Sequence, residues 1–525
     1  MNRRTYIAIL FLGVALAYTL CFVFAGFGNH QDPLYWLYKY TTLEGGWMAT
    51  GTLLTGGVLV RLFGAQLLPL RLAGWLCVVT AIALPYCCLQ TKEQRRANLP
   101  WLALTYLFMG YGAFQEFSPG TLSVLLLSAL WVSVSKSNIK HHTSYIAAIL
   151  LGIAVSVRFP NILALLVLIP LWKKSSLWKI PMAALSAALI YLLGYFFITP
   201  SPMDAAMTSH DLVPMLTKLW SHSGTMILYA LMTVGVLAIG KSFHHSIIPS
   251  FHHSIIPSFH HSIIPSFIVG ALLLLVAIYT TKPTQWYNAD LTYLISAMII
   301  VLAIKSSITN HQSPIAIGVL LLCVATLGTD TAWLKLFPAV LCLLPLAAIQ
   351  YELPIRRYLF TVLVIFSLVV IYRMSTNSVG RTNLTQVQTI SSVVPYQGIA
   401  IREAEQVRLN QYIADYDSLY TIHHTPYTVL AVGQENHLMR AVTGCQAARF
   451  NEFWSNIYDS VYTAKYREII RTERPVVFCS FSPQFKTKPA YRDKESAFER
   501  MLLDEGYQAL DRSTYRYMIY IPTEY

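Results

Sequence analysis

Long apolar runs alternate with short polar connections along most of the chain, and this pattern changes only near residue 375. The first run covers about residues 5–25 and follows Arg3 and Arg4. It is long enough to cross a hydrocarbon layer of about 30 Å as a helix. It is too long for the apolar part of a signal peptide, and no convincing cleavage site follows it. We therefore predict an uncleaved first span that starts in the cytoplasm.

Further spans are predicted after an interruption. The segment 47–64 is rich in Gly and Thr. We expect it to lie as a helix in the outer membrane interface, because this choice puts the next basic cluster on the cytoplasmic side. The remaining spans fall at roughly 67–90, 98–116, 118–135, 143–158, 160–172, 180–199, 224–240, 267–281, 289–304, 313–328, 332–349 and 358–374. The pattern predicts a membrane all-α domain over 1–374 with about thirteen transmembrane helices.

The segment 375–525 has a different pattern. Its β-rich runs are 418–422, 427–432, 475–480 and 515–521. Its helical patterns are 401–412, 462–472 and 495–505. Such alternation predicts one small soluble α/β domain. Cys445 and Cys479 lie in this segment and could pair in an oxidising compartment, although two cysteines do not establish a bridge.

Composition and charge support this division. Hydrophobic residues make up 55% of the chain and charged residues only 12%, whereas soluble proteins carry about a quarter charged residues. The segment 375–525 holds sixteen basic and sixteen acidic residues, so the net charge of +13 belongs to the first 374 residues. The rule that basic residues favour cytoplasmic loops explains this excess better than a nucleic-acid partner does.

Fourteen of the 22 basic residues in the first 374, Lys305 among them, fall in predicted cytoplasmic connections. The odd number of spans places 375–525 on the other side. We predict a multi-pass inner (plasma) membrane protein with a cytoplasmic N-terminus and an extracytoplasmic (periplasmic) C-terminal domain. One cytoplasmic loop holds a low-complexity tandem repeat, 242–265, with six histidines. Its regular prolines oppose a helix that would gather them, so a dispensable insertion is favoured over a metal site.

Charged residues of the membrane part gather on the predicted outer side. Seven of its nine acids fall there: Asp32, Glu44, Glu116, Asp204, Asp211, Asp290 and Asp330. The basic residues on that side are Lys39, Arg61, Arg71, Arg158, Lys218, Lys282, Lys335 and Arg373. Ionisable groups beside a bilayer are costly, which indicates a polar cavity, although solvated loop residues are the simpler alternative. Cations hold phosphate, and a carboxylate can take a proton from an attacking hydroxyl.

Short motifs in this region resemble a known family, the GT-C glycosyltransferases, which include protein O-mannosyltransferases and the lipid A aminoarabinose transferase. The motifs are GNHQDP at 28–33, LEGGW at 43–47, LFG at 62–64, LRL at 70–72, EFSP at 116–119 and VRFPN at 157–161. The resemblance implies inverting transfer of a sugar from a polyprenyl-phosphate donor to a glycan, lipid or protein acceptor at the outer face. It implies membrane lipids as surroundings and no nucleotide cofactor.

The resemblance also assigns roles to residues. Asp32 becomes the catalytic carboxylate, which either activates the acceptor hydroxyl or helps to hold a divalent cation such as Mg or Mn. Many relatives have a second acid after this Asp, whereas Pro33 follows it here. Metal dependence is therefore open, and an Asp-Pro turn is the structural alternative.

Other residues of the predicted site are assigned less directly. Glu116 is predicted as a second acid, with a helix-end residue as the alternative. Arg158 is predicted to bind the donor phosphate, with a snorkelling side chain as the alternative. The other predicted substrate-binding residues are Glu44, Arg71, Asp330 and Lys335, and Asp330 is equally suited to cap the following helix.

Two other functions share parts of this pattern. A polytopic flippase that moves a polar lipid or glycan would also have many spans and a polar cavity, but transporters usually carry charges in the middle of spans, and here they lie at the ends. A polysaccharide polymerase or ligase would share the donor chemistry. The C-terminal domain would recognise the acceptor or only brace the outer loops.

Overall fold

The computed structural model of the chain describes residues 3–26, 31–109, 117–137, 141–172, 178–200, 224, 226–235, 289–309, 313–324, 332–347, 353–376, 384–423, 428–433, 436–444, 460–480, 489–510 and 517–523. The chain divides into two compact units. The first unit comprises 1–25, 43–58 and 69–385, and the second comprises 26–42, 59–68 and 386–525. The second unit thus joins two pieces of the first predicted outer loop to the C-terminal segment.

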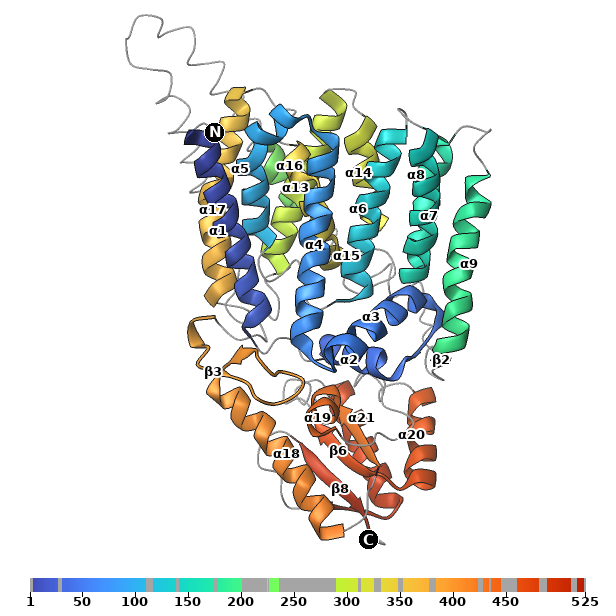
Figure 1. Cartoon of the computed structure of the whole chain (residues 1–525). Coiled ribbons are helices and arrows are strands. Elements are labelled where there is room, and N and C mark those ends of the chain that lie inside the picture. The colour runs from blue at the N-terminus through green and yellow to red at the C-terminus, as the bar shows by residue number, and fades with distance from the viewer. Residues whose placement is uncertain are drawn as a thin grey trace, which may run out of the picture. The chain divides into compact units, whose positions relative to one another are not determined.

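The first unit is built from helices that run side by side (Figure 1). Its main helices are α1 (Arg3–Phe24), α4 (Leu67–Leu89), α5 (Lys92–Met109), α6 (Pro119–Ser137), α7 (His141–Val157), α9 (Lys179–Phe197), α13 (Ala289–Thr309), α14 (Ser313–Cys323) and α17 (Leu353–Thr376). Four described stretches are long and apolar enough to cross a membrane: Thr5–Phe24, Leu67–Leu89, Pro119–Lys136 and Lys179–Phe197. The described helices fit a membrane protein, and the total of thirteen spans stays a prediction.

Outward-facing apolar side chains fit the same environment. On α9, Tyr195 is 81% exposed and Phe196 is 70% exposed. Leu10 and Val14 of α1 are also exposed. Moving a large apolar group out of water lowers the free energy. These faces are therefore suited to contact with lipid.

Two predicted spans are interrupted. The run 160–172 forms a 3-10 turn η2 (Phe159–Leu163), a short α8 (Ala164–Leu168) and another 3-10 turn η3 (Ile169–Leu171). The prediction of one span of α-helix was wrong here, because prolines at 160 and 170 cannot donate backbone hydrogen bonds. The run 332–349 likewise divides into α15 (Ala332–Leu341) and α16 (Leu344–Ala347), where proline stands at 345. The predicted span 267–281 and the repeat 242–265 lie outside the described residues.

Local capping explains where two helices begin. At the start of α6, the Ser118 backbone N–H donates to Thr121 Oγ1 (3.1 Å), and the Thr121 N–H donates to Ser118 Oγ (3.4 Å). At the start of α5, Thr91 and Gln94 exchange equivalent bonds. Such reciprocal bonds satisfy backbone donors that have no partner inside the helix. The first pair fixes the Ser-Pro junction that follows Glu116 in the sequence.

The segment 47–64 is helical as predicted: η1 (Trp47–Ala49) leads into α3 (Thr50–Phe63). Figure 1 shows α3 lying crosswise at the ends of α7 and α9. Val58 and Leu62, one helical turn apart, are exposed on α3. A short crosswise helix with an exposed apolar edge is typical of the membrane interface.

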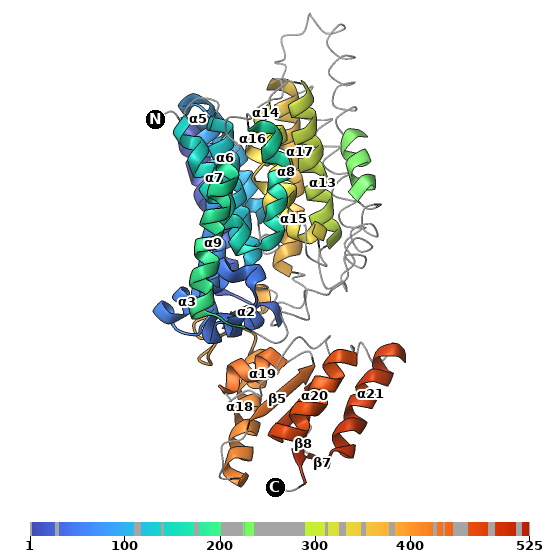
Figure 2. The ribbon, with the colours of Figure 1, turned by 90° about the vertical axis from the view of Figure 1, so that its right-hand side faces the viewer.

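The C-terminal part of the second unit contains a four-stranded mixed sheet with the order β5-β6-β8-β7 (Figure 2). Its strands are β5 (Val429–Gly433), β6 (Val476–Ser480), β7 (Tyr507–Leu510) and β8 (Met518–Pro522). β5 and β6 are parallel, whereas β8 is antiparallel to both β6 and β7. A small ladder of β3 (Thr389–Ile390) and β4 (Ala400–Ile401) precedes them. The helices are α18 (Glu403–His423), α19 (Asn436–Thr443), α20 (Ser460–Glu473) and α21 (Pro489–Asp504).

The sequence pattern failed at one place in this sheet domain. The predicted β-rich run 418–422 lies inside α18. Buried side chains recur along α18 at Glu405, Leu409, Tyr412, Asp415 and Leu419. This spacing is that of one helix face, so burial along the whole helix outweighs the local preference for a strand.

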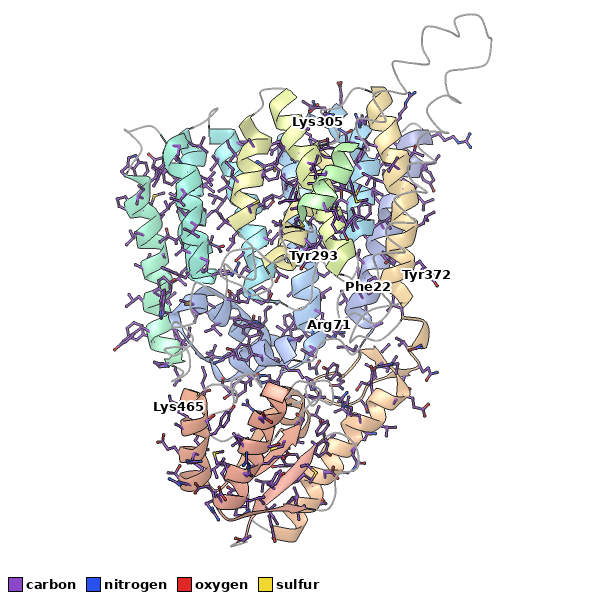
Figure 3. The ribbon with its side chains drawn as sticks, turned by 180° about the vertical axis from the view of Figure 1, so that it is seen from behind. Phe22, Arg71, Tyr293, Lys305, Tyr372 and Lys465 are labelled. Atoms are coloured by element: carbon purple, nitrogen blue, oxygen red, sulfur yellow. The ribbon has the colours of Figure 1, made fainter. Side chains whose placement is uncertain are left out.

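Two charged residues mark the ends of the first unit. Lys305 and Arg71 lie at opposite ends of the layer of helices (Figure 3). The loop charges assign these two residues to opposite sides of the membrane. Which end faces the cytoplasm stays a prediction.

Candidate functional site

Arg158 lies at a corner between two helical segments of the first unit. It follows the last residue of α7 and caps η2 in an extended conformation, with φ −157° and ψ 111°. Its backbone N–H donates to Ala154 O at 3.1 Å, and the residue is 8% exposed. A guanidinium presents five donors in one plane, which matches phosphate oxygens. The backbone of Arg158 is therefore fixed at this corner, and its side chain is of a kind that can bind phosphate.

Asn161 holds this corner through hydrogen bonds to α6 and α7. Its Nδ2 donates to Ser123 Oγ on α6 (2.9 Å) and to Ala154 O on α7 (2.8 Å), and its backbone N–H donates to Arg158 O (2.9 Å). The side chain is fully buried. Buried polar groups that are hydrogen-bonded in this way specify a single arrangement. Asn161 belongs to the VRFPN motif, but it was not among the residues predicted for the site.

The start of α3 packs against the end of α7, next to Arg158. Thr52 Oγ1 donates to Val157 O, the residue before Arg158, at 2.9 Å in a buried environment. An ideal Cβ placed on Gly51 would lie 2.7 Å from Ser156 Oγ and 3.1 Å from Val157 N. The close approach of α3 to the end of α7 thus leaves little room for a side chain at position 51. Nothing in the sequence signalled this long-range contact, because 105 residues separate Thr52 and Val157.

The segment that precedes α3 is held against the same helices. The rings of Trp47 and Phe159 meet edge to face, with centroids 4.7 Å apart. Glu44 lies in β1 (Glu44–Gly45), which pairs in parallel with β2 (Thr199–Pro200). The Thr199 N–H donates to Leu43 O at 2.9 Å. The LEGGW motif therefore lies at the ends of α7 and α9, and its Trp touches the VRFPN motif.

Leu43 itself has an unusual backbone. Its φ is +52°, in the left-handed region, and its side chain is buried. Few residues other than glycine adopt this conformation, and it is retained where surrounding contacts over-determine it. The bond from Thr199 to Leu43 O is one such contact. This turn fixes the position of Glu44 relative to α9.

Arg71 lies in the first turns of α4 and is 3% exposed. The Phe117 N–H donates to Leu70 O at 2.8 Å. Phe117 directly follows Glu116 in the sequence, so this bond joins the EFSP motif to the LRL motif. The structure thus brings together two further motifs that lie more than 40 residues apart in the sequence.

The other predicted site residues are described only in part. Asp32 lies in the first turn of α2 (Gln31–Thr42), and Lys335 lies on α15; the side chains of both are outside the described part of the structure. Glu116 and Asp330 lie wholly outside it. Their predicted roles stay predictions.

The described residues include no group of three His, Cys, Asp or Glu side chains that could hold a metal ion. Whether Asp32 helps to hold a divalent cation stays open. Cys479 is a free, buried thiol in β6, and Cys445 lies outside the described residues.

Comparisons with known proteins add a likeness to a solved structure. No family model matches the sequence, and no curated protein matches it. The chain is similar to the crystal structure of ArnT from Cupriavidus metallidurans bound to undecaprenyl phosphate, with 11% sequence identity, a TM-score of 0.40 and coverage of 98% of each chain. Both the identity and the TM-score are low, and the likeness carries no conclusion about activity.

Proposed function

We propose that the chain is an integral-membrane glycosyltransferase that transfers a sugar from a polyprenyl-phosphate donor to an acceptor at the extracytoplasmic face, with inversion at the sugar carbon. The observation that carries this proposal is the pairing of distant motifs within the first unit. LEGGW contacts VRFPN through Trp47 and Phe159, and LRL bonds to EFSP through Leu70 and Phe117.

The buried cations of these segments suit the donor. Arg158 and Arg71 are both nearly fully buried. A guanidinium group can bind phosphate oxygens with two parallel bonds. In the proposed reaction they hold the donor phosphate and stabilise the charge that develops on it as the sugar leaves.

The proposed base is Asp32. Its carboxylate takes the proton of the acceptor hydroxyl while the acceptor oxygen attacks C1 of the sugar. The bond between C1 and the phosphate oxygen breaks, and polyprenyl phosphate leaves with the electron pair. Attack from the face opposite the leaving group inverts the anomeric configuration. A divalent cation would lower the charge of the leaving phosphate, and the proposal does not depend on it.

The test is a transfer assay with purified protein in proteoliposomes, a panel of radiolabelled undecaprenyl-phosphate sugars and candidate glycan, lipid and protein acceptors. Asp32→Asn is expected to abolish transfer without loss of expression, because an amide conserves shape but cannot accept the proton. Glu93→Gln is the matched control, since Glu93 is an exposed acid at the start of α5. Undiminished product from Asp32→Asn would remove the catalytic assignment.

Donor binding has its own test in the same assay. Arg158→Ala is expected to raise the Michaelis constant for the donor at least about tenfold, the effect of losing a charge-assisted bond. Arg96→Ala removes an exposed cation of α5 and serves as control. An unchanged Michaelis constant in Arg158→Ala would count against its role. Movement of the labelled lipid across the bilayer without any product would favour the flippase.

A further inference from the structure

The C-terminal segment packs directly against the helix that carries Asp32. Within the second unit, the guanidinium carbon of Arg440 on α19 lies 3.7 Å from the ring centroid of Tyr38 on α2. One turn earlier on both helices, the rings of His437 and Tyr35 meet edge to face at 5.5 Å. Arg440 and His437 are 6% and 2% exposed. A cation stacked on an aromatic face gains more when both are shielded from water.

Both partners are fixed by their own surroundings. On α2, Tyr35 and Tyr38 are three residues apart and so lie on one face of the helix, and Trp36 stacks on Tyr40 at 5.9 Å. On α19, Leu438 and the neighbouring Met439 are almost fully buried, and the helix packs on β5 and β6. The contact therefore joins α2 to the sheet rather than to a loop.

A second bond holds the chain just before α2. The Gly26 N–H donates to Ala400 O in β4 at 2.8 Å. The GNHQDP motif thus has a contact with the C-terminal segment on each side, Gly26 before it and the face of Tyr35 and Tyr38 after it. The contacts of Gly26, Tyr35 and Tyr38 thus hold the described residues on both sides of the motif to the C-terminal segment.

We infer that the C-terminal domain is the positioning element for Asp32, and that Arg440 is a positioning residue which acts through Tyr38. This inference rests on the proposed function, because it assumes that Asp32 must be held in place for chemistry. A catalytic group displaced by about 1 Å can cost about a hundredfold in rate. The domain is thereby needed for the rate of transfer even where it does not touch the substrates.

The first readout is steady-state kinetics of the full chain, with the donor and acceptor that give product in the transfer assay. Arg440→Leu and Tyr38→Leu are each expected to lower kcat about tenfold while the Michaelis constant for the donor changes less than about twofold. The double variant should be no slower than either single variant, because both remove the same contact. Tyr38→Phe keeps the ring and should retain most of the rate.

The control is Arg474→Leu. Arg474 also stacks on a tyrosine of the C-terminal domain, with its guanidinium carbon 5.0 Å from the ring centroid of Tyr507, but this pair does not involve α2. It is expected to leave kcat within about twofold of the parent. An equal loss of rate in Arg474→Leu would overturn the inference, since general weakening of the domain would then explain both.

The second readout does not require transfer. Gln31→Cys places a thiol beside Asp32, and peptide mass spectrometry follows its reaction with N-ethylmaleimide in proteoliposomes. Arg440→Leu is expected to speed this reaction several-fold, and Arg474→Leu is not. Equal rates in the parent and Arg440→Leu would overturn the inference.

The two proposals can fail separately. If Asp32→Asn keeps full activity while the thiol responds as expected, the proposed function fails and the positioning of α2 stands. If Arg440→Leu does not reach the membrane, Tyr38→Leu and Tyr38→Phe are compared in its place. Equal rates of transfer in these two variants would overturn the inference, because only Tyr38→Phe keeps the ring on which Arg440 stacks.

Discussion

Gly51→Ala tests whether the contact between α3 and α7 controls the Arg158 corner. The added methyl group would lie 2.7 Å from Ser156 Oγ, 3.1 Å from Val157 N and 3.2 Å from Ser156 C. Real Cβ atoms essentially never come within 3.0 Å of another atom, and the contacts at 3.1 and 3.2 Å are tighter than most and involve backbone atoms that cannot rotate away. α3 must therefore shift by a few tenths of an ångström, and overpacking of this kind costs about 1–3 kcal/mol.

The shift acts on the site through Thr52. Its hydroxyl bonds to Val157 O at 2.9 Å, so any displacement of α3 lengthens this bond and releases the carbonyl next to Arg158. We expect Gly51→Ala to lower the thermal midpoint in detergent and to raise the Michaelis constant for the donor about tenfold. Thermal unfolding and the transfer assay measure the two effects separately.

A matched control and a partial rescue sharpen the test. Gly13 in α1 has no heavy atom within 4 Å of an ideal Cβ, so Gly13→Ala should leave both quantities unchanged or slightly improved. Ser156→Gly removes the nearest clash and should restore part of the loss in Gly51→Ala. If Gly51→Ala unfolds and binds donor as the parent does, the close approach is refuted.

Four further predictions concern other residues of the chain. Thr52→Val leaves Val157 O without its bond and should destabilise the chain by about 1–3 kcal/mol, whereas Thr55→Val, whose hydroxyl bonds to Gly51 O within the same helix, should cost less than about 0.5 kcal/mol in the same thermal scans. Asn161→Ala removes two side-chain bonds and should raise the donor Michaelis constant more than Ser123→Ala, which removes one; equal values would argue against a role for Asn161 in the corner. Burial, helped by Glu499, raises the pKa of the Cys479 thiol well above its usual value, so alkylation should be at least about a hundredfold slower in the folded chain than in guanidinium. The same shift means that the contribution of this thiol to stability is full below pH 9 and declines above it, as the unfolded thiol ionises and the folded one does not.

The helices of the first unit were predictable because lipid demands long apolar runs. The predicted spans 67–90 and 180–199 match α4 and α9 to within a few residues. The break in the run 160–172 was not predictable from hydropathy, because hydropathy measures apolar character and proline interrupts the backbone hydrogen bonds of a helix. In the C-terminal domain, the β-rich run 418–422 is part of α18, because burial along one helix face outweighs the local preference of these residues for a strand.

For the candidate site, the sequence pointed only to residues that carry a charge inside a familiar motif, and their roles stay predictions. Arg158 and Arg71 were named for that reason, and both are buried at the ends of helices. Gly51, Thr52 and Asn161 were not named, since a glycine, a hydroxyl and an amide give no signal until their partners on other helices are known. Arg440 was missed because it lies in a segment of evenly mixed charge, about 400 residues after its partner Tyr38.

This separation in sequence has a consequence for biogenesis. The ribosome delivers α2 early and α19 about 400 residues later, which takes on the order of 20–80 s at normal rates of synthesis. During that time the face of α2 that carries Tyr35 and Tyr38 lacks α19, against which it packs in the folded chain. A chain that stops before residue 436 would leave this face uncovered and open to proteases, so late truncations are expected to lower the amount of the whole protein rather than yield a stable fragment.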